Sequence, residues 1–155
     1  MSEYKTISYR MPDNHRHSIV IDVDILVPVS VMGYPQNQKM SLNAKALIDT
    51  GASRSAISSN IVQNAKLSSY ERCTIRMAKG EYDSPVYTVD IMFPNKMTAL
   101  NIKAAEFTAC HDFDLIIGMD ILRKLDIAIT NAKNITFISF RSPPADEHID
   151  FTKNL

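Results

Sequence analysis

The stretch ALIDTGASRSAIS, residues 46–58, places an aspartate at the end of an apolar run. Asp49 follows two apolar residues and precedes Thr50 and Gly51, and the tripeptide Asp-Thr-Gly occurs once in the chain. A carboxylate at the end of a buried strand is costly to keep ionised unless hydrogen bonds, a partner charge or a shared proton stabilise it. Asp49 therefore needs a chemical role and a partner, and no second copy of its motif supplies one.

The composition indicates one globular domain. Of the 155 residues, 45% are apolar and 22% are charged, which is enough apolar material for a single core. The formal net charge of zero lacks the basic excess that is typical of nucleic-acid-binding proteins. We find no signal peptide at the start and no apolar run of the roughly 20 residues that a membrane span requires.

Cysteine usage indicates a reducing compartment. Cys73 and Cys110 are isolated, without metal-ligand spacing, and are expected to be free thiols. We therefore expect a cytoplasmic protein that binds neither nucleic acid nor a membrane and that uses no metal and no other cofactor.

Most of the chain reads as short strands with alternating apolar and polar residues, separated by turn residues. The predicted strands are residues 18–32, 39–49, 73–78, 84–93, 98–107, 114–118, 126–130 and 135–140. Two short helices are predicted at residues 58–66, which open with an N-cap signal, and at residues 119–125. The pattern predicts an all-β domain, a closed or semi-closed barrel.

The domain is expected to span residues 18–140. Residues 1–17 are polar and mixed in charge, and are predicted to form an N-terminal arm. Residues 141–155 are polar, contain two consecutive prolines, and are predicted to form a flexible C-terminal tail. Pro28 is expected at a strand edge or a bulge, and residues 33–38 in a turn.

Two further features follow Asp49 in a fixed order. A hairpin with Gly80 at its turn comes first, and the buried strand of residues 114–118, DLIIG, ends later at Gly118. Each feature alone is weak, because Asp-Thr-Gly can end an ordinary strand in a polar turn and many buried strands end at a glycine. Their order is more informative than any one of them.

Together these features resemble the retropepsin-type aspartic proteases, the single-domain relatives of pepsin, from about residue 19 to residue 140. In that family Asp-Thr-Gly-Ala ends a strand and presents the catalytic carboxylate. The hairpin is a mobile flap over the substrate, and the late apolar strand packs beneath the catalytic loop and leads into a short helix. The segments IIGMDIL, residues 116–122, and GEYDSPVYTVDI, residues 80–91, look closer to the bacterial and cellular branch than to retroviral enzymes.

The resemblance assigns roles to particular residues. It implies that Asp49 is catalytic and that the loop around it is supported by Thr50, Gly51 and Ala52, with the Gly51 N–H close enough to bond the carboxylate. The flap residues expected to contact substrate are Met77, Ala78, Lys79, Gly80 and Glu81. The residues expected to pack beneath the site are Ile116, Ile117 and Gly118.

The sequence departs from the retroviral pattern at two positions. Retroviral members usually carry a charged residue four positions after the catalytic aspartate and an arginine directly after the late glycine. Ser53 and Met119 stand at these positions. The corresponding ion pair is therefore absent, and a different contact must brace this branch of the family. Asp120 is expected near the start of the helix, where a carboxylate suits the helix dipole.

Hydrolysis by carboxylates requires two of them sharing a proton. One acts as a base on a water molecule and the other donates a proton to the carbonyl oxygen. No other aspartate of the chain has the Ser/Thr-Gly context. Because a two-fold axis places the same residue opposite itself, the partner is expected to be Asp49 of a second copy.

The leading interpretation is thus an aspartic endopeptidase that acts as a homodimer on an extended polypeptide. Residues 135–140 are the expected intersubunit strand. Two alternatives remain open. One is a catalytically silent retropepsin-like dimer that binds peptides or assembles without cleaving them. The other is an unrelated β-barrel in which Asp49 is an ordinary turn residue.

Overall fold

The computed structural model describes residues 4–11, 18–27, 40–77, 80–108, 110, 112–147, 150 and 152. Its strands are β1 (Lys5–Arg10), β2 (Val20–Val27), β3 (Met40–Ile48), β4 (Ala56–Ser58), β5 (Glu71–Met77), β6 (Gly80–Met92), β7 (Thr98–Phe107), β8 (Leu115–Ile117), β9 (Asp126–Ala132) and β10 (Ile135–Ser142). Its helices are α2 (Ser59–Asn64) and α3 (Met119–Leu122). The all-β prediction is confirmed, and both predicted helices are present.

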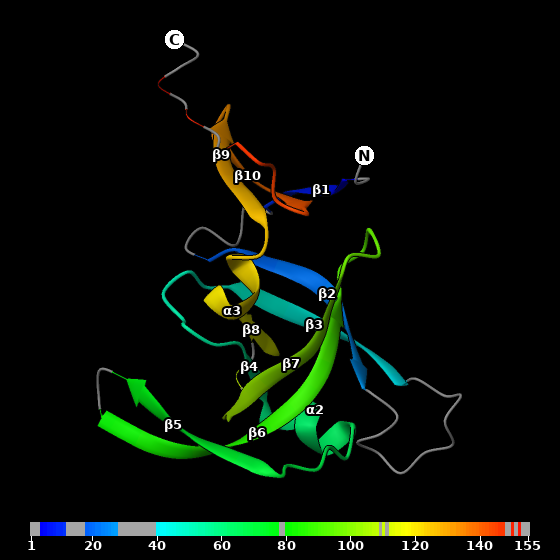
Figure 1. Cartoon of the computed structure of the whole chain (residues 1–155), viewed down its shortest axis with the longest axis vertical. Helices are drawn as coiled ribbons and strands as arrows, with labels where there is room; N and C mark the ends of the chain where they lie inside the picture. The colour runs from blue at the N-terminus through cyan, green and yellow to red at the C-terminus, as the bar shows by residue number, and fades with distance from the viewer. Residues whose placement is uncertain are drawn as a thin grey trace.

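Six of the described strands close into a barrel (Figure 1). Their order is β2-β3-β8-β4-β7-β6, and β6 pairs back with β2. β5 extends the sheet outside the closed ring, where it pairs with β6 as a hairpin. The predicted closed barrel with two short helices is therefore confirmed.

The core follows from the period of two along the strands. On β2, Ile21, Val23 and Ile25 are buried and alternate with the more exposed Asp22 and Asp24. Successive side chains of a strand point to opposite faces, so one face of β2 fills the barrel and the other meets solvent. β8 shows the same alternation, because Leu115 and Ile117 are fully buried and Ile116 between them is partly exposed.

A second, three-stranded sheet has the order β1-β10-β9, and it lies above the barrel in Figure 1. Phe140 of β10 joins the two parts, because its ring packs 5.8 Å from the ring of Phe93 and 6.3 Å from the ring of Tyr9, measured between centroids. β10 is the middle strand, so both of its edges are occupied within the chain. The expectation that residues 135–140 supply the intersubunit strand is therefore wrong.

The two ends of the chain hold more structure than their polarity indicates. β1 lies within the predicted arm and pairs with β10 from Lys5 opposite Ser142 to Arg10 opposite Phe137. At the other end β10 continues to Ser142, and the Ala145 N–H donates to the Asp126 carboxylate at 2.9 Å. That hydrogen bond, together with the Arg141 guanidinium, holds the pKa of Asp126 below its ordinary value.

Some predictions fall on residues that lie outside the described part of the chain. These are Pro28, the turn at residues 33–38 and residues 12–17 of the predicted arm. Among the described residues, no helix has the length and apolar character needed to cross a membrane.

Candidate active site

Asp49 lies where β3 ends and the chain must pass around β8. β3 pairs in parallel with β8, and the Asp49 N–H donates to the carbonyl oxygen of Ile117 at 3.1 Å. β4 pairs with the opposite edge of β8. Residues 49–55 therefore form a loop, called here the Asp49 loop, that crosses the end of β8 on its way from β3 to β4.

The carboxylate of Asp49 is held from its own loop. The Gly51 N–H donates to Oδ1 of Asp49 at 2.8 Å, which is the hydrogen bond expected from the resemblance. A Cβ atom at position 51 would lie only 3.2 Å from the same oxygen, so glycine allows this close approach. Asp49 is half-buried, and in the described part of the chain no Lys or Arg forms an ion pair with it. The carboxylate is thus oriented by its own loop and has no cationic partner among the described residues.

Gly118 lies directly beneath the Asp49 loop. A Cβ atom there would lie 2.6 Å from the carbonyl carbon and oxygen of Arg54 and 2.9 Å from the carbonyl oxygen of Ala52. Backbone atoms cannot move aside as a flexible side chain does, so this position requires glycine. The Met119 N–H donates to the Ala52 oxygen at 2.8 Å. The end of β8 and the start of α3 therefore pack against the loop at Gly118 and Met119.

Ser55 is a supporting residue that was not predicted from the sequence. Its side chain is fully buried. Its Oγ accepts a hydrogen bond from the Gly118 N–H at 3.1 Å and donates to Oδ1 of Asp120 at 2.8 Å. This network links the loop to α3 close to the positions at which retroviral members carry their ion pair. Asp120 is thus engaged with Ser55 as well as lying in the first turn of α3.

Asp114 holds the opposite end of β8. Its carboxylate accepts from the Lys45 N–H at 3.1 Å, and its own N–H donates to the Lys45 carbonyl oxygen at 2.8 Å. Its carbonyl oxygen accepts from the Ser58 N–H at 2.9 Å. Asp114 therefore fastens the start of β8 to β3 and β4, which is a structural task distinct from that of Asp49.

The β5–β6 hairpin carries the residues predicted to contact substrate. Met77 pairs with Gly80, whose φ of 130° lies in the region that favours glycine. Ala78 and Lys79 lie outside the described residues, as does the side chain of Met77. Glu81 is exposed and forms an ion pair with Arg76 across the hairpin at 2.6 Å. In Figure 1 the hairpin and the Asp49 loop both project to the left of the barrel.

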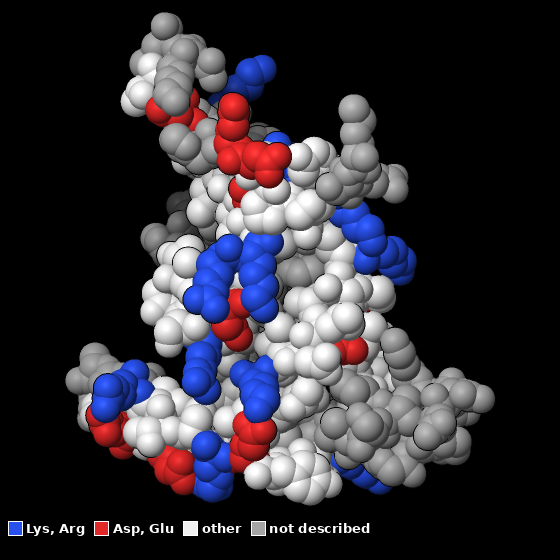
Figure 2. Space-filling model, viewed as in Figure 1, with Lys and Arg blue, Asp and Glu red and all other residues white. Residues whose placement is uncertain are grey.

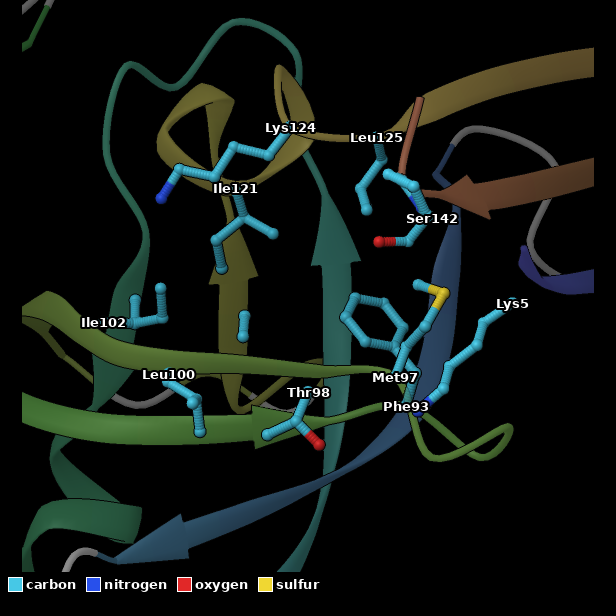
Figure 3. A pocket seen from close by; sticks show the side chains of 12 residues that line it. Lys5, Phe93, Met97, Thr98, Leu100, Ile102, Ile121, Lys124, Leu125 and Ser142 are labelled. Atoms are coloured by element: carbon cyan, nitrogen blue, oxygen red, sulfur yellow. The ribbon is translucent and has the colours of Figure 1, made fainter. Parts of the chain in front are cut away.

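Two hollows flank α3, and they differ in character. One, of about 620 Å³, includes Thr50 and Gly51 of the Asp49 loop. The other, of about 490 Å³, is mainly apolar and is lined by side chains such as Leu100 and Ile121 (Figure 3). The apolar hollow contains no residue of the Asp49 loop. Within the described residues, no three His, Cys, Asp or Glu side chains are grouped as metal ligands.

Comparisons with known proteins agree with this geometry. The family model described as gag-polyprotein putative aspartyl protease matches residues 39–124. That segment is more than half of the chain and runs from β3 through the Asp49 loop and the hairpin to α3. The chain therefore belongs to this family of aspartyl proteases. The comparison with curated proteins finds no match.

A solved structure shares the fold. It is described as the crystal structure of a retropepsin-like aspartic protease from Rickettsia conorii. The two chains superpose with a TM-score of 0.56 at 15% identity, covering 91% of this chain and 97% of that chain. The prediction of a retropepsin-like fold, similar to a bacterial member, is confirmed.

Proposed function

We propose that the protein is an aspartic endopeptidase that acts as a homodimer, with a water molecule activated between the Asp49 carboxylates of two protomers. The observation that carries this proposal is the state of Asp49. Its carboxylate is fixed by the Gly51 N–H, lies on a loop supported by Gly118 and Ser55, and forms no ion pair among the described residues. A carboxylate that is oriented but not neutralised is suited to share a proton with a second one.

The chemistry needs one ionised and one protonated carboxyl group. The ionised Asp49 removes a proton from the water, whose oxygen attacks the carbonyl carbon of the peptide bond. The protonated Asp49 of the other protomer donates its proton to the carbonyl oxygen. When the tetrahedral intermediate collapses, the first Asp49 gives the proton it took from water to the amine nitrogen and the C–N bond breaks. The Asp49 of the other protomer, now ionised, takes back a hydroxyl proton as the carbonyl group re-forms. The two carboxyl groups end with one shared proton, as they began.

Neighbouring aspartates of the same chain support the need for a second protomer. The Asp114 carboxylate accepts a hydrogen bond from the Lys45 N–H at the far end of β8, and the Asp120 carboxylate accepts one from the Ser55 hydroxyl. Both carboxylates therefore bind groups of their own barrel. A two-fold axis beside the Asp49 loops supplies the missing carboxylate from an identical loop, with Thr50 bonding across the axis.

The β5–β6 hairpin is the proposed flap. β5 lies outside the closed ring of the barrel, so the hairpin is attached along one side only. In this proposal, residues 77–81 close over a peptide that lies extended between the β5–β6 hairpin and the Asp49 loop. Backbone groups of the protein then form hydrogen bonds with the peptide, as with an added strand.

The replacement Asp49→Asn tests the proposal. Asn keeps an oxygen for the Gly51 N–H but cannot act as a base, so cleavage is expected to fall by about 10²–10⁴-fold or more. The measurement is the release of new amino termini from a pool of unstructured peptides. The matched control is Asp112→Asn, an exposed aspartate two residues before Asp114, which should cleave like the wild type.

Two results would contradict the proposal. The first is an Asp49→Asn variant that cleaves as fast as the wild type. The second is a folded wild-type dimer that binds peptides of the pool without cleaving any of them, which is the behaviour of a silent peptide-binding dimer.

A transition-state mimic that carries a tetrahedral hydroxyl in place of the scissile carbonyl should inhibit the wild type.

A further inference from the structure

The hollow of about 620 Å³ is lined in part by residues of the Asp49 loop. Thr50 and Gly51 line it directly after Asp49, and Ser53 and Arg54 continue its wall along the same loop. α3 and β7 form the remaining walls. A polypeptide that places its scissile bond at Asp49 therefore has side chains within reach of this hollow.

The wall of this hollow is rich in cations. Arg54, Lys103 and Arg123 line it, against the single carboxylate of Asp120. Figure 2 shows Lys and Arg side chains gathered on this face over the region of α3. The concentration is local, because the formal net charge of the whole chain is zero.

Two of these cations form no ion pair with any described residue. Lys103 pairs with Glu71, with 2.8 Å between Nζ and Oε2, and Asp120 is occupied by the Ser55 hydroxyl. Arg54 and Arg123 are exposed, and neither takes part in an ion pair among the described residues. The hollow thus presents two guanidinium groups next to the Asp49 loop that form no ion pair within the described part of the chain.

Guanidinium groups in such a place favour a carboxylate. The planar fork of arginine binds both oxygens of a carboxylate with two parallel hydrogen bonds. A dimer with its two-fold axis beside the Asp49 loops also brings two copies of this basic wall into one cleft. Like charges that share a cleft repel each other, so an acidic ligand between them lowers the electrostatic energy.

We propose that this hollow is a substrate subsite that selects an acidic side chain, Asp or Glu, close to the scissile bond, and that Arg54 and Arg123 bind its carboxylate. The inference rests on the proposed function, because it places the peptide at Asp49. It adds the class of substrate, which is a polypeptide with an acidic residue beside the cleavage point.

Paired peptides test the subsite. Each pair is neutral apart from one position, which carries Glu in one member and Gln in the other, and the position is moved along the peptide from pair to pair. For the wild type, kcat/KM is expected to be about tenfold higher for the Glu member at one position, as charge-assisted hydrogen bonds predict. This preference should weaken as ionic strength rises, because the subsite is open to solvent.

The variants Arg54→Gln and Arg123→Gln, singly and together, should bring the Glu-to-Gln ratio of kcat/KM towards one. A general loss of activity lowers kcat/KM for both peptides of a pair equally, so the Glu-to-Gln ratio reports only the recognition of charge. Lys124→Gln is the matched control, because Lys124 is adjacent to Arg123 in the chain but lines the apolar hollow of Figure 3. The control should keep the preference, and Arg123→Glu should lower the Glu-to-Gln ratio further than Arg123→Gln does, because it adds a repelling carboxylate.

Failure of this inference is distinguishable from failure of the proposed function. Cleavage without a Glu preference at any position contradicts the subsite proposal, and so does a preference that survives in the double variant. Neither result contradicts the proposed protease function. If the wild type cleaves no peptide, the proposed protease function is wrong, and the affinity of the protein for the same peptide pairs is then measured. Tighter binding of Glu peptides that depends on Arg54 and Arg123 then sustains the subsite, and equal binding overturns it.

Discussion

The Asp49 loop depends on residues whose partners lie far away in the chain. Gly118 leaves room for the backbone of Arg54, and Ser55 connects the N–H of Gly118 with the carboxylate of Asp120. These contacts join positions 63 and 65 residues apart. The catalytic candidate is therefore supported by the packing of the barrel as well as by its own tripeptide.

Ser55→Ala is expected to loosen the loop. The change leaves the Gly118 N–H and the Asp120 carboxylate without their buried partner, which costs about 1–3 kcal/mol in the free energy of unfolding. The cleavage rate should fall as well, because Asp49 belongs to the same loop. Chemical denaturation and the peptide assay measure the two effects.

Ser53→Ala is the control for this prediction, since Ser53 lies on the same loop but is exposed. It should unfold within about 0.5 kcal/mol of the wild type. Equal stabilities of the Ser55 and Ser53 variants would contradict the bracing role of Ser55.

At the level of single residues, the sequence was enough to predict part of the site. Asp49 and Gly51 stand in a local motif, and the hydrogen bond between them spans two residues. Ser55 is one of several serines in the segment, and only its burial against β8 and α3 distinguishes it. Arg54 and Arg123 were not predicted either, because their proximity arises from the fold.

At the level of elements, strands with strong alternation were predicted well. The strand at residues 98–107 agrees with β7 in both bounds, and the strand at residues 39–49 agrees with β3 to within one residue at each end. β1 was missed because the segment KTISYR is short and polar and buries only parts of Ile7 and Tyr9. Its partner is β10, near the opposite end of the chain, so its pairing leaves no local pattern.

Phe140→Ala is expected to separate the three-stranded sheet from the barrel. Phe140 is 2% exposed and contacts both Tyr9 and Phe93. Loss of a buried phenylalanine ring costs about 3–5 kcal/mol in the free energy of unfolding. Chemical denaturation measures this cost.

The control is Ile129→Ala on β9, whose side chain is 49% exposed. Its cost should stay below about 1 kcal/mol, because little apolar surface is lost. A Phe140 variant as stable as the Ile129 variant would show that the sheet does not depend on this contact.

At the level of the whole molecule, the barrel follows from strand pattern and spacing, and the family from the order of three local features. The arrangement of two protomers does not follow in the same way. The expected intersubunit strand is the middle strand of a sheet within one chain. The contact surface between two protomers must therefore involve other residues. What remains of the dimer proposal is its chemical basis, namely a single Asp-Thr-Gly motif and a mechanism that requires two carboxylates.

Mixing wild-type and Asp49→Asn chains tests this central claim most directly. Subunits are allowed to exchange at a fixed amount of wild-type chain, and cleavage is measured with peptide in large excess. If each site takes one carboxylate from each protomer, an equal amount of variant pairs with about half of the wild-type chains. Activity should then fall to about half, and further as more variant is added. Activity that stays constant at every ratio would contradict the account, because each chain would then hold a complete site.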